Sequence, residues 1–133
     1  MEIKEDGRKI LIGKRRSGKT LKLVNICLNK VQEGGSVLYA APFMKGSFSW
    51  LITMFRDEFR NRTYGVGEVI YNAQERLLKF PNGSSIQFTS KDYIKGTNYN
   101  PRKFEDYFKV YDEEGWDSSY FDLISINGEL YDE

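Results

Sequence analysis

The sequence has no histidine and only one cysteine, Cys27, among its 133 residues. Without imidazole groups, the chain has no histidine to act as a general base, a triad member or a metal ligand. A single thiol excludes a disulfide framework and a cysteine-based zinc site, and it is typical of a reducing cytosol. No apolar run approaches the roughly 20 residues of a membrane-spanning helix, so we expect neither a secreted nor a membrane protein.

An excess of charge of either sign is also absent. The 20 lysines and arginines against 19 aspartates and glutamates give a net charge of +1, so overall charge does not identify a partner. Hydrophobic residues make up 40% of the chain and charged residues 29%, which is typical of globular rather than disordered or fibrous proteins. The length predicts one domain over residues 1–133.

Charge is nevertheless distributed unevenly along the chain. Residues 14–19 include four cations and no acid, whereas residues 112–133 include eight acids and no lysine or arginine. A cationic segment near one end and an acidic one near the other indicate phosphate and metal chemistry. For the last dozen residues, a solvated acidic tail is an equally good interpretation.

A strand, a helix and a second strand are predicted near the N-terminus. Residues 9–13 form an apolar run that ends in glycine, which predicts a buried strand. From Gly18 to the Gly34-Gly35 pair, helical spacing predicts a helix whose buried face holds Leu21, Val24, Cys27 or Leu28, and Val31. Residues 36–41 predict the second strand. This order forms a βαβ unit, which requires parallel pairing and a right-handed crossover.

Further elements follow along the chain. Five apolar residues at helical spacing predict a helix over about 47–62 with an aromatic core-facing side: Phe48, Leu51, Ile52, Phe55 and Phe59. Strands are expected near residues 67–71, 76–80, 85–89, 107–111 and 121–126. The turn residues 81–84 predict a hairpin between two of these strands, and residues 90–103 are expected to form a loop.

Residues 13–20, GKRRSGKT, match the phosphate-loop pattern GxxxxGK[ST]. Gly13 and Gly18 permit backbone conformations in which successive N–H groups converge on a phosphate, and the following helix directs its positive end at that anion. Lys19 would contact the β- and γ-phosphates, and the Thr20 hydroxyl would bind Mg²⁺. The motif follows a predicted strand and opens a predicted helix, which is the context that this chemistry requires.

Such a loop also needs carboxylates for the metal and for the attacking water. Asp112 and Glu113 follow the predicted strand 107–111, so Asp112 would lie at the carboxyl edge of the sheet, where ligands bind in such folds. Asp112 is expected to associate with the metal. Glu113 is expected to activate the water, because there is no histidine, and Glu114 is the alternative if the register shifts by one residue.

The phosphate loop with arginine at its third position resembles the ATPase domain of bacteriophage large terminase subunits, the motors that package viral DNA. Three further segments are similar to that family in their order along residues 9–115: VLYAAPFMKGSF, then NGSSIQF and IKGTNYN, and finally FKVYDEEG. The resemblance implies a P-loop NTPase-like α/β fold, with a mainly parallel sheet flanked by helices and an inserted β-hairpin.

The resemblance also implies roles for individual residues. Arg15 matches the family's arginine that senses or stabilises the γ-phosphate, within a nucleotide-binding loop that also includes Lys14, Arg16 and Ser17. The matches at Lys19, Thr20, Asp112 and Glu113 agree with the roles inferred from the residues themselves. Ser125 matches the small hydroxyl residue that couples hydrolysis to movement.

The function expected from the resemblance is an ATP- and Mg²⁺-dependent hydrolase acting in viral DNA packaging or translocation. Its partners would be double-stranded viral DNA and either further copies of itself or other packaging proteins, in the host cytoplasm at the procapsid portal. Only twelve residues precede Gly13, where the family has an adenine-contacting segment, and there is no room for the family's nuclease domain. We therefore expect a reduced ATPase without DNA cleavage.

Two other functions remain open. The first is a nucleotide-binding or interaction protein that has lost turnover. The second is a small P-loop kinase, although no lysine or arginine follows Glu113 to form a lid over the acceptor.

Several cations outside these roles also have alternative interpretations. Lys14 and Arg16 could reach DNA phosphates or a neighbouring subunit's nucleotide, or could simply be solvated. Residues 90–103 combine the aromatics Tyr93 and Tyr99 with Arg102 and Lys103, a composition suited to single strands but also to an exposed loop.

Overall fold

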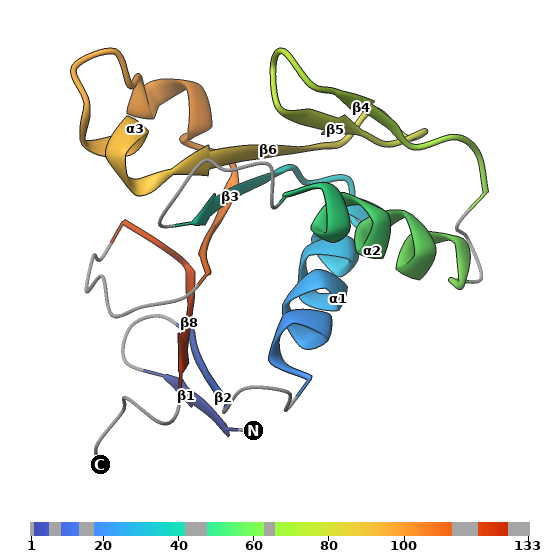
Figure 1. The fold of residues 1–133 in the computed structure, drawn as a ribbon, viewed down its shortest axis with the longest axis horizontal. Coiled ribbons are helices and arrows are strands. Elements are labelled where there is room, and N and C mark those ends of the chain that lie inside the picture. The colour runs from blue at the N-terminus through green and yellow to red at the C-terminus, as the bar shows by residue number, and fades with distance from the viewer. Residues whose placement is uncertain are drawn as a thin grey trace.

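The computed structural model describes residues 2–5, 9–13, 18–41, 48–62, 66–112 and 120–127. These residues form an α/β fold with a mixed sheet flanked by helices (Figure 1). The strands are β1 (Glu2–Glu5), β2 (Lys9–Gly13), β3 (Val37–Ala41), β4 (Ile70–Asn72), β5 (Leu77–Lys79), β6 (Ser85–Ser90), β7 (Phe108–Tyr111) and β8 (Leu123–Asn127). The helices are α1 (Lys19–Gln32), α2 (Phe48–Arg60), α3 (Lys91–Lys95) and the short 3₁₀ helix η1 (Pro101–Phe104).

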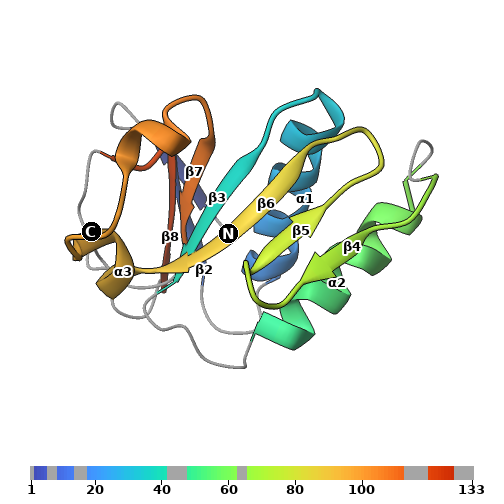
Figure 2. The ribbon, with the colours of Figure 1, turned by 90° about the horizontal axis from the view of Figure 1, so that it is seen from above.

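The strands lie in the order β1-β2-β8-β7-β3-β6-β5-β4. The five central strands, from β2 to β6, pair in parallel, whereas β1, β5 and β4 pair antiparallel with their neighbours. Figure 2 shows the sheet in front of α1 and α2. The expected mainly parallel sheet with an added hairpin is confirmed, since β5 and β6 form the hairpin predicted around residues 81–84.

Helix α1 connects β2 to β3 and contacts both strands. The predicted direct pairing of these two strands was wrong, because β8 and β7 lie between them in the sheet. The buried face of α1 includes Leu23, and Leu21 is 44% exposed, so the prediction that Leu21 faces the core was wrong. The helix ends at Gln32, shortly before the predicted stop at Gly34, which has φ 94°. The N–H of Gly34 donates to the carbonyl of Val31 and that of Gly35 to the carbonyl of Lys30, which satisfies the last turn.

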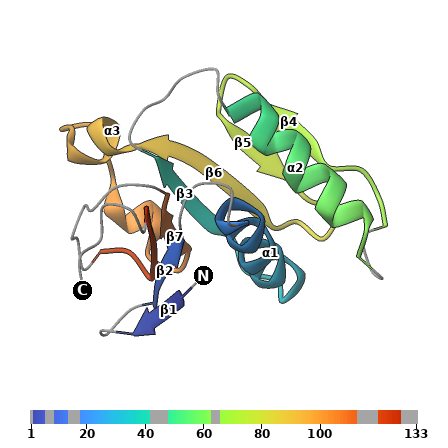
Figure 3. The same cartoon turned by 60° about the horizontal axis from the view of Figure 1, so that its bottom comes forward.

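Helix α2 lies beside α1 on the same face of the sheet (Figure 3). The five apolar residues that predicted it are all buried. The rings of its three phenylalanines join an aromatic core with residues of the sheet. Phe55 illustrates this core: its ring lies 6.0 Å from that of Tyr39 and 5.9 Å from that of Phe88. The prediction that the aromatic side of α2 is core is confirmed, whereas Trp50 points to solvent.

A second, smaller apolar cluster lies on the opposite face. Alternation along β3 sends Tyr39 towards α1 and α2 and sends Ala40 to this other face, where it packs with Tyr111, Phe121 and Ile124. Ile94 of α3 packs against the same cluster. Helices therefore flank both faces of the sheet, with the larger core beneath α1 and α2.

The prediction that residues 90–103 form a loop was wrong. Ser90 caps α3 by accepting a hydrogen bond from the N–H of Tyr93, and Asn100 caps η1 by accepting one from Arg102. Both helices are too short to show a hydrophobic period, which explains why the sequence pattern did not reveal them. Strand β1 was not predicted either, and no helix among the described residues has the length and hydrophobicity needed to cross a bilayer.

Candidate nucleotide-binding site

The residues predicted to bind nucleotide follow neighbouring strands of the sheet. Strand β8 lies between β2, which ends at Gly13, and β7, which Asp112 follows. Ile124 of β8 pairs with both Ile10 and Tyr111, so Asp112 is level with Leu11. Two residues of a parallel strand span about 7 Å, so along the strand direction Asp112 lies about 7 Å before the end of β2 at Gly13.

The start of α1 has the conformation that the phosphate-loop motif predicts. Gly18 is the N-cap with φ 82° and ψ 16°, a left-handed conformation that glycine adopts without steric cost, and it provides no side-chain cap. The first N–H groups of any α-helix have no intrahelical acceptor, which leaves them available to an anion. Lys19 is 7% exposed and Thr20 half-buried, so both lie against the protein rather than in open solvent.

Four predicted loop residues, Lys14, Arg15, Arg16 and Ser17, lie outside the described residues. The predicted acids Glu113 and Glu114 do so too. Their assignments therefore stay predictions.

Asp112 lies in a network of side-chain hydrogen bonds from two adjacent strands. The hydroxyl of Tyr39 donates to its Oδ2 at 2.6 Å, and the hydroxyl of Ser125 donates to its Oδ1 at 2.7 Å. Phe108 and Val110 pack with the α1 core, and alternation sends the Asp112 side chain to the same face. Two short bonds to hydroxyls hold both carboxylate oxygens in place.

Ser125, predicted from the resemblance alone, is completely buried in β8. Its hydroxyl reaches Asp112 because β8 lies beside β7, which brings a residue of the last strand against the predicted metal-associated acid. Tyr39 was missed by the sequence analysis. It lies in an apolar run, where the sequence pattern predicts only a core aromatic side chain. No local sequence signal predicts the hydrogen bond from its hydroxyl to Asp112, 73 positions away.

The donors predicted for Mg²⁺ among the described residues are the Asp112 carboxylate and the Thr20 hydroxyl. Among the described residues, no group of three or more histidine, cysteine, aspartate or glutamate side chains could hold a metal ion. Mg²⁺ is usually bound through one or two carboxylates together with substrate phosphates and waters. A single carboxylate at Asp112 and a hydroxyl at Thr20 match that pattern.

The thiol of Cys27 lies on the buried face of α1 near this network. Burial, reinforced by the negative charge of Asp112, raises the pKa of Cys27 well above its ordinary value. The thiol therefore stays protonated and is a poor nucleophile or metal ligand at neutral pH.

The mixed aromatic and cationic segment lies away from this network. Tyr99 is half-buried, its ring stacks on Phe104 at 5.7 Å, and its hydroxyl shares a 2.6 Å hydrogen bond with that of Tyr120. Desolvation and this bond raise the pKa of Tyr99 above its ordinary value. Tyr93 is exposed, as are Arg102 and Lys103. The segment thus forms an exposed surface that is anchored by Tyr99.

Lys109, which interrupts the apolar pattern of β7, does not lie at an edge of the sheet. Strand β7 is central, and the Lys109 ammonium lies 5.3 Å above the Tyr120 ring and donates to the carbonyls of Glu105 and Tyr107. These contacts allow a cation at the amino end of a central strand.

Comparisons of the chain with protein-family models, with curated proteins and with solved structures gave no match.

Proposed function

We propose that this protein binds a nucleoside triphosphate with Mg²⁺ and hydrolyses it, in the manner of a P-loop ATPase. The observation that supports this most is the arrangement of Gly13, Gly18 and Asp112. The GxxxxGKT motif follows β2 and leads into α1. Asp112, which accepts hydrogen bonds from two hydroxyls, follows β7, and β8 lies between β7 and β2 in the sheet. Gly13 and Asp112, from segments far apart in the sequence, thus both follow or end parallel strands at their carboxyl ends, where ligands bind in α/β folds.

Each residue has a defined task in this proposal. Lys19, partly desolvated, neutralises charge on the β- and γ-phosphates, where a buried cation acts more strongly than one in water. Thr20 and Asp112 would hold Mg²⁺, which neutralises the phosphate charge that develops during transfer. Glu113 orients the attacking water and accepts its proton.

The hydroxyls of Tyr39 and Ser125 orient Asp112. Each carboxylate oxygen has two acceptor sites, so the bond from one hydroxyl does not by itself exclude a metal-bound water as a further donor. The network fixes the side chain before nucleotide arrives, which lowers the entropic cost of forming the site. Ser125 lies on β8, between β2 and β7, and bonds Asp112 directly, so a movement of Asp112 would also displace β8.

The finer proposal is an ATPase of the terminase type, acting on double-stranded viral DNA as part of an oligomeric packaging motor. It is supported by the order of the sequence motifs and by the Ser125–Asp112 contact, although Ser125 lies in the middle of β8 and not at the strand end that the resemblance implies. Arg15 would stabilise the γ-phosphate in this scheme.

The test is calorimetric titration of ATP and GTP with Mg²⁺, followed by phosphate-release assays with and without double-stranded DNA. Lys19→Ala should abolish detectable binding, and Glu113→Gln should bind nucleotide but lose at least about a hundredfold in turnover, as removal of a catalytic base does. Lys22→Ala removes an exposed cation from the same helix and should change neither property. Absence of heat with both nucleotides would overturn the proposal.

The same experiment separates the alternatives. Binding without hydrolysis in the presence and absence of DNA would replace the ATPase by a nucleotide-binding module. Hydrolysis that DNA does not stimulate would retain the ATPase and reject the DNA motor. Transfer of phosphate to a nucleoside monophosphate would establish a kinase.

A further inference from the structure

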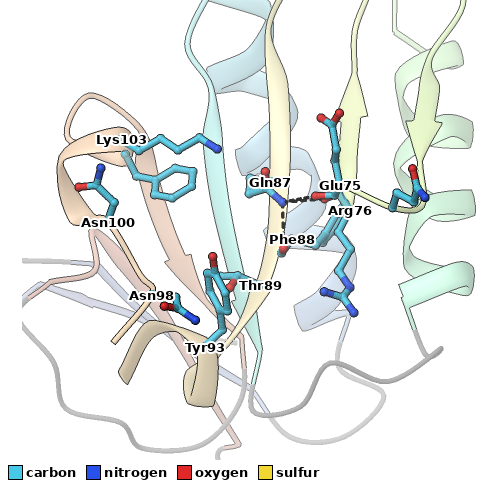
Figure 4. A pocket seen from close by; sticks show the side chains of 11 residues that line it. Glu75, Arg76, Gln87, Phe88, Thr89, Tyr93, Asn98, Asn100 and Lys103 are labelled. Carbon is cyan, nitrogen blue, oxygen red and sulfur yellow. Dashed lines mark hydrogen bonds between the residues drawn. The ribbon is translucent and has the colours of Figure 1, made fainter. Parts of the chain in front are cut away.

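A polar cavity of about 460 Å³ lies on the face of the sheet that α1 and α2 leave uncovered (Figure 4). Phe88 of β6 packs into the core beneath α2, so alternation sends the side chains of Gln87 and Thr89 to the cavity. The turn between β4 and β5 forms one wall, and the segment from α3 to η1 forms the other. The cavity has a size typical of small-molecule sites.

Arg76, on the turn wall, has φ 54° and is the only non-glycine residue with positive φ among the described residues. This backbone is fixed by two contacts to the Arg76 carbonyl, from the N–H of Phe88 at 3.0 Å and from the Gln87 amide at 3.1 Å. Glycine adopts such a conformation without steric cost, whereas arginine does not. A strained residue that lines a cavity indicates that its side chain has a use there.

The cavity presents cations from both walls. Arg76 comes from the turn and Lys103 from η1, and Figure 4 shows the two side chains on opposite sides of Gln87. Glu75 is the one acid among the described lining residues, so these residues have an excess of one positive charge. This balance favours an anionic ligand.

The remaining lining groups are aromatic rings and carboxamides. Tyr93 is 53% exposed and offers a ring face, while Asn98 and Asn100 offer amide groups on the same wall. The wall is held from behind by Tyr99, whose ring lies 6.0 Å from that of Tyr93. Aromatic faces stack on nucleobases, amides bond base edges, and arginine and lysine bind phosphate, so this combination matches a nucleotide with an accessible base.

We propose that this cavity binds a nucleotide unit whose base is unpaired, with its phosphate between Arg76 and Lys103 and its base against Tyr93. The unit is either a free mononucleotide or one residue of a single strand, since the recognised chemistry is the same. The cavity lies across the sheet from α1, so the inference does not depend on hydrolysis at the phosphate loop.

The test uses the full chain in EDTA without any triphosphate, which keeps the phosphate-loop site out of the measurement. A fluorescent single-stranded decanucleotide, its duplex form and an adenosine monophosphate competitor are titrated by anisotropy. We expect the single strand to bind at least tenfold more tightly than the duplex. Competition by the monophosphate identifies a free nucleotide as sufficient, and its failure identifies the strand.

Arg76→Gly is the diagnostic variant because stability and binding should move in opposite directions. Relief of the positive φ should raise the melting temperature by a few degrees, while loss of the guanidinium should weaken binding at least tenfold. Tyr93→Ala should weaken binding to a similar extent. Arg102→Ala removes the same charge from an exposed residue that precedes Lys103 in the sequence but does not line the cavity, and it should change affinity less than twofold.

Three results would overturn the proposal. Equal losses in Arg76→Gly and Arg102→Ala would mean attraction by charge alone. Equal affinity for duplex and single strand would mean that no base is read. Absence of binding by both the single strand and the monophosphate would leave the cavity without this ligand, whatever the outcome for ATP hydrolysis.

Discussion

The two faces of the sheet differ in what their side chains do. On the face covered by α1 and α2, apolar side chains fill the space beneath the helices, and the hydroxyls of Tyr39 and Ser125 bond Asp112. On the opposite face, a small apolar cluster lies beside a polar cavity. The first face provides most of the buried area, and the second keeps charged and amide groups accessible to solvent.

This difference shows how stability and binding are divided within one sheet. Burial of large aromatic side chains is the main source of folding free energy, whereas a polar cavity contributes little and tolerates strain such as that at Arg76. The Asp112 network joins both properties, since its hydroxyl donors are buried core residues while its carboxylate lies at the predicted nucleotide edge. Substitutions on the two faces should therefore have separable effects.

The largest expected effect is on the helix-covered face. Phe55 is completely buried and contacts two aromatic rings, so Phe55→Ala should lower the free energy of unfolding by about 3–5 kcal/mol. Tyr93→Ala, on the exposed cavity wall, should change it by no more than about 0.5 kcal/mol. Urea denaturation followed by circular dichroism measures both. Comparable losses would contradict the division between the faces.

Much of the helix-covered face could be predicted from sequence, because its signals are local. The apolar spacing that ends at Phe59 gave α2, and the glycines at 18 and 34 gave the bounds of α1 within a residue or two. The insertion of β8 between β2 and β7 could not be predicted, because strand order depends on pairing between segments far apart in the chain. The Tyr39–Asp112 bond was missed for the same reason.

The opposite face was predicted less well. Residues 90–103 have no hydrophobic period, and their two short helices depend on the caps at Ser90 and Asn100, whose residue types are equally common in loops. The cavity arises only when the β4–β5 turn and η1 come to lie on either side of β6. The positive φ of Arg76 is equally hidden, because the residue type gives no indication of it.

An intermediate effect is expected at the Asp112 network. Ser125→Ala removes one hydroxyl donor from a buried position, and the loss should destabilise the fold by about 1–3 kcal/mol because Asp112 Oδ1 loses that hydrogen bond. If Ser125 also orients Asp112 for catalysis, turnover should fall at saturating nucleotide while nucleotide affinity changes less. Phosphate release measured at a temperature well below unfolding separates the two effects.

The matched control for that variant is Thr53→Ala. The Thr53 hydroxyl lies at the surface and donates a 3.1 Å hydrogen bond to the carbonyl of Ser49 in its own helix. Its removal should leave both stability and turnover nearly unchanged. A Ser125→Ala variant that resembles Thr53→Ala in both measurements would show that the contact with Asp112 is dispensable.

The smallest expected effect is a pH dependence from Cys27 on the helix-covered face. Burial and the charge of Asp112 raise the pKa of the folded thiol above the ordinary value of 9.0. A raised folded pKa stabilises the fold fully below the unfolded value and progressively less as pH rises towards the folded value, because only the unfolded thiol ionises. By pH 9.5 the loss of unfolding free energy from this thiol should reach about 0.8 kcal/mol.

Urea denaturation between pH 7.5 and 9.5 should show this extra loss in the native chain and not in Cys27→Ala, whose own cavity cost is independent of pH. Identical pH profiles for the two proteins would mean that Cys27 is less enclosed by α1 and the sheet than the structure indicates.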